Sequence, residues 1–410
     1  YLPGGINTIR IFNVLSYLGS VVLMNKIGKR ILVNKSEFIV GIVYVAFVPL
    51  ALYIPFIYGN LMGFFFSLLA IEAAFCFCEK KDWKSMVVLI ISASFSVLIK
   101  QNFLIPVIGI FLFLFVQAIF DKKIKIVVVS LTMVFFVWFT GILVNVRMET
   151  MSDANLNQGI PATAWVAMGM QQTLMANGWY NAYNEKTYIE NDCNPEKTNQ
   201  VAIEEIKNRL SYFVSHPSQL VFFFLKKDSS QWNHPNFEGF WVNYDCQREK
   251  FDIPTKKVLG IFQKITNEPG SLKVNEYLNL YQTIILIGVC AWIVLCRKDI
   301  KKEQLLLALI VIGGFVFHTF WEGKSQYTIT YYALLIPYGI AGYQGIVKEL
   351  LEIDVKGKIH LKELWENKAF RYVVVVCAIL IICSCLEFKL GNSPLCYEDN
   401  LYKEYLQQIN

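Results

Sequence analysis

The sequence predicts an all-α polytopic membrane protein, and three observations support this fold class. Ten apolar stretches follow one another along the chain, clusters of Lys and Arg occupy every second connection, and one long polar interval interrupts the series. The chain is 55% hydrophobic with a mean hydropathy of +0.42, above the values of soluble domains of this size. Each stretch can cross, or nearly cross, a hydrocarbon layer about 30 Å thick at about 1.5 Å per helical residue.

About ten transmembrane helices are therefore expected in this chain, together with one extracytoplasmic α-rich domain. The predicted spans are residues 7–24, 37–55, 60–78, 84–99, 102–120, 125–145, 278–296, 305–320, 327–346 and 370–387. The polar interval 146–277 is too long for a connecting loop and has the size of a small domain. The expected parts are transmembrane helices 1–6 (1–145), the extracytoplasmic domain (146–277), transmembrane helices 7–10 (278–387) and an extracytoplasmic C-terminal tail (388–410).

The distribution of charge predicts the orientation. Lys and Arg cluster in alternate connections, at 26–35, 80–84, 122–125, 297–302 and 348–371. The short connections between these clusters hold only Lys100 and Lys324. Basic loops stay in the cytoplasm, so residue 1, the polar interval and the tail are expected outside. The net charge of +6 is divided among separate inner loops, which favours contact with membrane lipid and argues against nucleic-acid binding.

The chain begins at Tyr1, without a start Met, on the side that the charge distribution places outside the cell. An N-terminus outside the cell needs a segment that exports it. We therefore expect an upstream span and about 11 or more spans in the full-length protein. A short translocated tail is the alternative.

Cysteine usage predicts no metal centre. Seven of the ten cysteines lie in or beside apolar stretches and are expected to act as small apolar residues. Cys193 and Cys246 lie in the polar interval, where a disulfide between them would suit an oxidising exterior. The sequence contains no CxxC pair and no histidine cluster, so no structural metal is expected.

The strongest local signal is the run HTFWEGKSQY at 318–327, between two spans. Ionisable groups beside the hydrocarbon normally face a cavity or a partner. Lys324, the cation of this turn, is suited to a phosphate. Candidate substrate ligands near it are His318, Glu322, Tyr327 and Tyr331. The structural alternative is a Glu322–Lys324 surface pair that merely ends a span.

Polar groups also occur in two other turns expected on this side. The turn YGN contributes Asn60, and the turn KQN contributes Lys100 and Asn102. In the polar interval, Trp179 and Trp232 stand in the runs GWYN and SQWN, and flat aromatic faces suit sugar rings. Aromatic residues beside a membrane also serve as interfacial anchors, so both interpretations of these tryptophans stay open.

With these motifs the chain resembles bacterial membrane glycosyltransferases of the C-type superfold, relatives of the protein O-mannosyltransferases and of the lipid A aminoarabinose transferase. The resemblance covers essentially the whole chain and is strongest to a Gram-positive subgroup with W-E-x-K-S-x-Y, G-W-Y-N and S-Q-W-N-x-P runs. It implies an enzyme of the bacterial plasma membrane. The implied donor is a sugar on a polyprenyl phosphate, and the implied acceptor is an extracytoplasmic cell-wall polymer, glycan or protein.

The resemblance also implies direct displacement with inversion at the sugar carbon, helped by cations that stabilise the leaving phosphate. Lys324 and Lys100 are the implied phosphate contacts, and Glu322 and Tyr327 would orient the head group. The implied reaction requires no cofactor that the sequence reveals, and a need for a divalent cation stays open.

The general base is not identified in this chain. In the resembled family a carboxylate of the first outer loop takes the proton of the acceptor hydroxyl. That loop is expected to lie before Tyr1, so the catalytic residues are unknown. The outer acids Asp153, Glu238 and Asp245 are not distinguished by their spacing.

Two other functions stay open. Transporters and lipid-linked sugar flippases usually show internal repeats and charged or broken helices near the midplane of the bilayer. The sequence shows no obvious repeat, and Glu72 is the main acid within a predicted span. A truncated, non-catalytic relative is the third interpretation.

Overall fold

The protein is mostly helical in the part of the chain described by this computed structural model. That part comprises residues 5–32, 38–152, 158–174, 176–240, 242, 270–295, 300–354, 365, 370, 371, 373–375 and 378. Its helices are α1 (Ile6–Ile31), α2 (Ile39–Ala46), α3 (Val48–Leu52), α4 (Asn60–Lys80), α5 (Trp83–Ile99), η1 (Gln101–Phe103), α6 (Leu104–Asp121), α7 (Ile124–Ser152), α8 (Ala162–Gly169), α9 (Tyr183–Glu190), α10 (Pro195–Ser215), α11 (Pro217–Trp232), α13 (Gly270–Leu295), α14 (Lys302–Phe320), η5 (Ser325–Tyr327) and α15 (Ile329–Asp354). No strand occurs in it, which confirms the predicted all-α class there.

Six helices in this part are long and apolar enough to cross a membrane. They are α1, α4, the continuous η1–α6 segment, α7, α13 and α14. Each coincides with one of the ten predicted spans. The predicted spans 84–99 and 327–346 correspond to α5 and α15, while most of 370–387 and all of the tail 388–410 lie outside the described residues.

The predicted span 37–55 is not one continuous helix. Its chain bends at Phe47, between α2 and α3, where φ is −77° and ψ is 73°. Pro49 follows in the first turn of α3, where its missing N–H is not needed. A second difference concerns α7, which continues to Ser152, beyond the predicted span end at 145. The polar interval therefore begins with the last turns of this helix.

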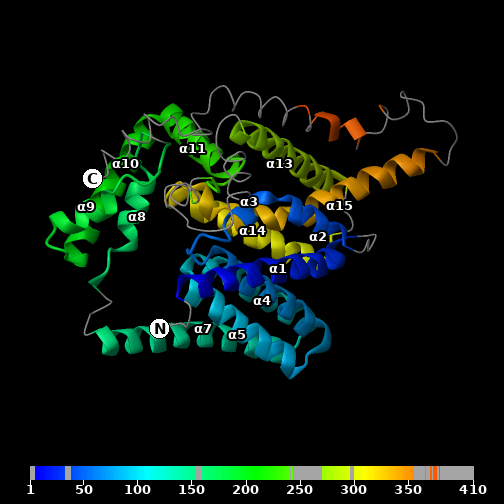
Figure 1. Cartoon of the computed structure of the whole chain (residues 1–410), viewed down its shortest axis with the longest axis horizontal. Coiled ribbons are helices and arrows are strands. Elements are labelled where there is room, and N and C mark those ends of the chain that lie inside the picture. Colours follow the sequence, from blue (N-terminus) through cyan, green and yellow to red (C-terminus); the bar gives the residue numbers. More distant parts are fainter. Residues whose placement is uncertain are drawn as a thin grey trace, which may run out of the picture.

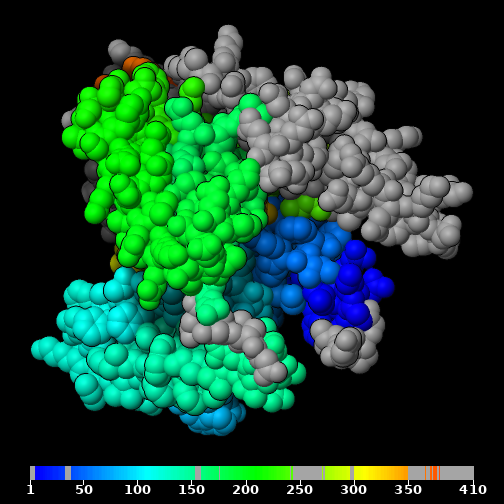
Figure 2. All heavy atoms as spheres, turned by 90° about the vertical axis from the view of Figure 1, so that its left-hand side faces the viewer, coloured from blue at the N-terminus to red at the C-terminus, as the bar shows by residue number. Residues whose placement is uncertain are grey.

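The bundle consists of helix pairs that pack along their lengths. The pairs are α13 with α15, α4 with α5, α1 with α4, and α6 with both α7 and α14. Aromatic side chains fill its middle, where the Phe47 ring lies 5.2 Å from the Tyr332 ring and 5.7 Å from the Tyr281 ring. Helices α8, α9 and α10 gather at one side of this bundle (Figure 1). Figure 2 faces that side and shows the α8–α11 residues above those of α5–α7.

The unit formed by α8, α9 and α10 has a small core of its own. Ala164, Ala167 and Ala202 are fully buried where α8 and α10 meet. The Asn194 side chain accepts hydrogen bonds from two backbone N–H groups at the start of α10, a favourable N-cap. Helix α11 then leads the chain back to the bundle, where it contacts α14 and η5.

The closest approach of two helices in the bundle requires glycine. A Cβ on Gly342 of α15 would lie 1.7 Å from the Gly288 carbonyl oxygen of α13. Small residues let membrane helices pack backbone against backbone. Gly342→Ala is therefore expected to lower stability by about 1–3 kcal/mol, because the two helices must separate. Thermal unfolding in detergent measures the loss.

Gly141 provides the matched control for this substitution. A Cβ at Gly141 on α7 meets nothing within 4 Å. Gly141→Ala is expected to leave the unfolding temperature unchanged or raise it slightly, since alanine is the better helix former. Equal unfolding temperatures for Gly342→Ala and the parent would contradict the close packing of α13 and α15.

An ion pair joins α1 to α4. Arg30 donates from Nε to Glu72 Oε2 at 2.9 Å and from Nη2 to Glu72 Oε1 at 2.8 Å. Its Nη1 reaches Glu79 Oε1 at 2.5 Å. Such a bidentate guanidinium–carboxylate pair is strong and specific in geometry. Glu72, the main acid within a predicted span, thus pairs with Arg30.

Arg30→Ala is expected to destabilise the protein by about 1.5–3 kcal/mol, because it leaves a half-buried carboxylate without its charged partner. The exposed pair of Lys81 and Asp121, 3.4 Å apart, serves as the control. Lys81→Ala should cost less than Arg30→Ala, because exposed ion pairs contribute little to stability. Chemical denaturation in detergent compares the two variants, and equal costs would refute the structural role of the Arg30–Glu72 pair.

Candidate functional site

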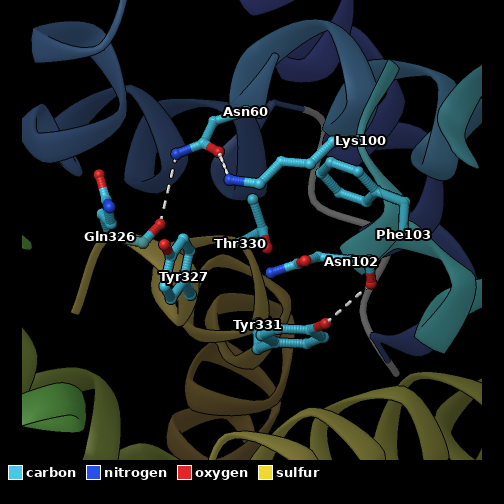
Figure 3. A pocket seen from close by; sticks show the side chains of 8 residues that line it. All are labelled: Asn60, Lys100, Asn102, Phe103, Gln326, Tyr327, Thr330 and Tyr331. Atoms are coloured by element: carbon cyan, nitrogen blue, oxygen red, sulfur yellow. Dashed lines mark hydrogen bonds between the residues drawn. The ribbon is translucent and has the colours of Figure 1, made fainter. Parts of the chain in front are cut away.

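Three polar segments that are distant in the sequence meet at one end of the bundle (Figure 3). Asn60 begins α4, Lys100 lies between α5 and η1, and the turn 321–327, which includes η5, joins α14 to α15. Asn60 Nδ2 donates to the Gln326 carbonyl oxygen at 3.3 Å, and the Lys100 amine donates to Asn60 Oδ1. The structure thus brings the three predicted polar turns together, and we call this group of residues the polar cluster.

Glycine makes this convergence feasible. Gly59 precedes α4 with φ +77°, a left-handed conformation that other residues adopt at a cost. A Cβ there would lie 3.0 Å from Ile99 Cγ2 and 3.1 Å from the Ile99 carbonyl oxygen. Glycine therefore lets the turn before Asn60 lie against the end of α5, next to Lys100.

The Lys100 ammonium lies between two tyrosine rings. Its Nζ is 4.1 Å from the Tyr58 ring centre and 5.0 Å from the Tyr327 ring centre, so both rings can stabilise its positive charge. The two hydroxyl groups are 3.3 Å apart. Burial lowers the pKa of Lys100 to about 7, against the opposing effect of Glu322. The charge of this amine is therefore sensitive to pH near neutrality.

A small pocket opens beside Lys100 (Figure 3). Its empty volume is about 230 Å³, open solvent included. The pocket is lined by side chains from the start of α4, from Lys100 and η1, from η5 and from the start of α15: Asn60, Lys100, Asn102, Phe103, Gln326, Tyr327, Thr330 and Tyr331. Five of the predicted site residues line this one pocket.

Glu322 holds the second lysine of the cluster. Its side chain is 1% exposed, with Oε1 3.3 Å from Lys324 Nζ and Oε2 accepting from the Tyr327 hydroxyl at 2.9 Å. Lys324 also lies over the Tyr180 ring, 5.0 Å from its centre. Burial would lower the pKa of Lys324, but the carboxylates of Glu322 and Glu238 outweigh burial and raise it. Lys324 therefore stays cationic. In its ion pair the Glu322 carboxylate is buried, while the Lys324 side chain is partly exposed.

Glu238 also belongs to the polar cluster, although its position in the sequence did not distinguish it. Its Oε1 accepts from Ser325 Oγ at 3.0 Å and from the Gln326 N–H at 3.3 Å. The backbone of Glu238 is left-handed, with φ +61°, as is that of Phe237 with φ +49°. Such strained conformations concentrate at functional sites. A lone acid in the turn-rich run HPNFEG is the sequence signal that could have identified it.

Lys227 is the second residue that the sequence analysis missed. The side chain is fully buried, and its amine donates to the carbonyl oxygens of Gly169 and Trp321, both at 2.6 Å. The Gly323 N–H donates to the Gly178 carbonyl oxygen at 2.6 Å. Burial lowers the pKa of Lys227 to about 7. These bonds attach the end of α8 to the turn 321–327, so α11 and the α8–α10 unit fix the place of Glu322 and Lys324.

The histidine of the predicted site lies behind the polar cluster. The His318 ring is fully buried and stacks on Tyr327, with ring centres 5.8 Å apart. It also meets the edge of Tyr331, whose hydroxyl donates to the Asn102 carbonyl oxygen at 3.4 Å. Both ring nitrogens of His318 are buried without a hydrogen-bond partner in the described part of the chain. His318 therefore supports the aromatic wall of the pocket and does not line it.

The two predicted tryptophans occupy closed positions. Trp179 is 3% exposed, and its indole nitrogen is buried without a hydrogen-bond partner in the described segments. Trp232 packs on Phe315 and Tyr331. Neither ring lines an open groove in this structure. Trp232 packs against Tyr331, which lines the pocket.

Side chains that could bind a metal are dispersed in the described part of the chain. Among the residues that the structure describes, no group of three or more His, Cys, Asp or Glu side chains could hold a metal ion. Cys193 is exposed, while Cys246 lies outside the described residues, so the Cys193–Cys246 disulfide stays a prediction. Asp153 and Asp245 also lie outside them.

Comparison with known proteins supports membrane integration. A family model described as "Conserved hypothetical integral membrane protein" matches residues 15–342. The match includes the polar cluster and its supporting helices. Comparisons with curated proteins and with solved structures found no match.

Proposed function

Since the chain belongs to this family of conserved hypothetical integral membrane proteins, we propose that its polar cluster is the active site of a membrane glycosyltransferase. The proposed enzyme transfers a sugar from a polyprenyl phosphate to an extracytoplasmic cell-wall polymer, glycan or protein. The observation that carries this proposal is that the turns of Lys100 and Lys324 meet at one aromatic pocket: Lys100 lines the pocket, and Lys324 is joined to the pocket residue Tyr327 through Glu322. The resemblance of the turns to C-type glycosyltransferases supports the same function.

The two lysines suit two tasks in such a transfer. Lys324 keeps its charge in a buried ion pair and can stabilise the phosphate as it leaves the sugar carbon. Lys100 has tyrosine rings on two sides and no carboxylate within ion-pair distance in the described structure, so an anion in the pocket would supply its missing partner.

The acids of the polar cluster suit positioning better than proton abstraction. Glu322 is engaged by Tyr327 and Lys324, and Glu238 by Ser325 and a backbone N–H. A general base must come within hydrogen-bond reach of the acceptor hydroxyl, and both carboxylates are buried, each 1% exposed. The proposal therefore leaves this role to a group outside the described cluster, as the resemblance implies.

The proposed location is the plasma membrane of a bacterium, with the polar cluster on the extracytoplasmic side. The basic connections at 80–84 and 122–125 join helices at the ends remote from Lys100. Under the positive-inside rule those connections face the cytoplasm, which supports an extracytoplasmic position for Lys100.

A transporter or lipid-linked sugar flippase is the second candidate. The break at Phe47 between α2 and α3 favours it, because interrupted helices often form transport sites. Glu72 does not add to this case, since it pairs with Arg30. A truncated, non-catalytic relative remains the third proposal.

A transfer assay tests the proposed function. The purified protein is placed in liposomes and supplied with radiolabelled sugars on polyprenyl phosphate, together with cell-wall glycan or protein acceptors. The proposal predicts label in the acceptor and release of polyprenyl phosphate. Movement of the labelled donor across vesicles that contain no acceptor, without any release of polyprenyl phosphate, would favour the flippase.

A further inference from the structure

Helix α11 has two faces of opposite character. Phe223, Lys227 and Gln231 follow one another at four-residue intervals and are buried. Val221, Phe222 and Leu225 lie on another face and are 55%, 60% and 62% exposed. A helix of 16 residues is too short to cross a bilayer, and α11 is not among the candidate spans. Its apolar face therefore needs another explanation.

The exposed face of α11 adjoins a helix that can cross the membrane. Ile312, Val316 and Phe320 form an exposed apolar stripe along α14, which is one of the six candidate spans. At the end of this stripe the Phe320 ring meets the Phe224 ring of α11, with centres 5.9 Å apart. A stripe of this kind on a membrane helix faces lipid, so lipid reaches the place where α11 begins to cover α14.

We propose that α11 lies within the head-group region of the lipid leaflet beside the end of α14. In this position Val221, Phe222 and Leu225 contact acyl chains, and the exposed amine of Lys226 contacts lipid phosphates. Short helices with one apolar face and flanking lysines bind membrane surfaces in this way. The inference concerns a lipid-binding surface and does not depend on the proposed transfer reaction.

The buried face of the same helix supports the polar cluster. Lys227 holds the Trp321 carbonyl oxygen at 2.6 Å, and Gln231 Nε2 donates to the His318 carbonyl oxygen at 3.2 Å. Thr328 Oγ1 donates to the Gln231 carbonyl oxygen at 2.8 Å. Helix α11 thus connects the leaflet to the turn 321–327. A lipid phosphate, which lies at the level of the head groups, would meet Lys100 and Lys324 at that depth.

Site-specific photo-crosslinking tests this surface. The photoreactive residue p-benzoylphenylalanine replaces Phe222 in one variant and Leu225 in a second, and both are reconstituted in vesicles of phosphatidylethanolamine and phosphatidylglycerol. Because both side chains are exposed, the variants should keep the parent elution profile and unfolding temperature in detergent. After irradiation, mass spectrometry of the α11 peptide is expected to show phospholipid adducts at both positions.

Glu204 provides the matched control, since it is exposed on α10 and polar. The same photoreactive residue at Glu204 is expected to give several-fold less phospholipid adduct. Equal adduct yields at Glu204 and Phe222 would overturn the proposal, as would cross-links from Phe222 to a second copy of the chain or to another protein in place of lipid. None of these outcomes depends on whether the protein transfers sugars.

Discussion

Lys324→Ala is expected to reduce sugar transfer from the polyprenyl-phosphate donor by at least about a hundredfold. Removing one group that stabilises the developing charge of a transition state typically costs about 10²–10³ in kcat. Lys324 keeps its charge because Glu322 and Glu238 raise its pKa, and its amine has only Glu322 as an ion-pair partner in the described structure. Turnover of the radiolabelled donor in liposomes, at saturating acceptor, measures the effect.

Two further variants separate chemistry from folding. Lys324→Ala leaves the buried Glu322 carboxylate without its partner, which by itself destabilises the turn. The double variant Lys324→Ala, Glu322→Gln removes both charges and should regain stability while transfer stays low. Lys197→Ala, which removes an exposed lysine paired with Asp192, should retain parental transfer. Parental turnover in Lys324→Ala would refute the phosphate role.

Phosphate binding is expected to weaken as pH rises through about 7, because Lys100 loses its proton there. The lowered pKa of Lys100 means that the amine is charged below this pH and neutral above it. An anion prefers the charged amine, so its affinity should fall by up to about tenfold for each pH unit above 7. The groups that face Lys100 are Glu322, Tyr58, Tyr327 and His318.

Lys100→Met is the variant that identifies the titrating group. It should bind inorganic phosphate and polyprenyl phosphate about tenfold or more weakly at pH 6, and it should remove the pH dependence above 7. The pKa of Lys227 lies in the same range, but its amine donates to two carbonyl groups. Its contribution to the pH dependence of phosphate binding should therefore remain small. Isothermal titration at pH 6, 7 and 8 compares the variants. A pH profile in Lys100→Met equal to that of the parent would contradict this assignment.

Periodic, local signals predicted much of the fold. Long apolar runs predicted the helical class and the positions of six long helices, because helix length and hydropathy are properties of one segment. The break at Phe47 was not predicted, since apolar composition does not change there, although Pro49 two residues later is a local signal for a helix boundary. The end of α7 was also missed, because polar residues at 147–152 continue a helix beyond the apolar run.

The candidate site was predicted in part for a similar reason. Lys100, Asn60 and the turn 321–327 each stand out as polar groups between apolar stretches, and the structure joins them. Lys227 comes after an apolar run and Glu238 lies in an aromatic turn, and in the sequence both resemble charged residues that face solvent or head groups. Their burial results from contacts across the fold, with Trp321 in one case and Ser325 in the other. No local pattern encodes such contacts.

The central claim is that the polar cluster holds the phosphate of a lipid-linked sugar, and affinity labelling tests it most directly. A polyprenyl phosphate with a photoreactive group beside the phosphate is irradiated with the protein in liposomes, and the labelled peptides are identified by mass spectrometry. The account predicts label in the peptides that contain Tyr58, Lys100 or Lys324, reduced by an excess of unlabelled donor. Label confined to other peptides, such as those of α7, would contradict it.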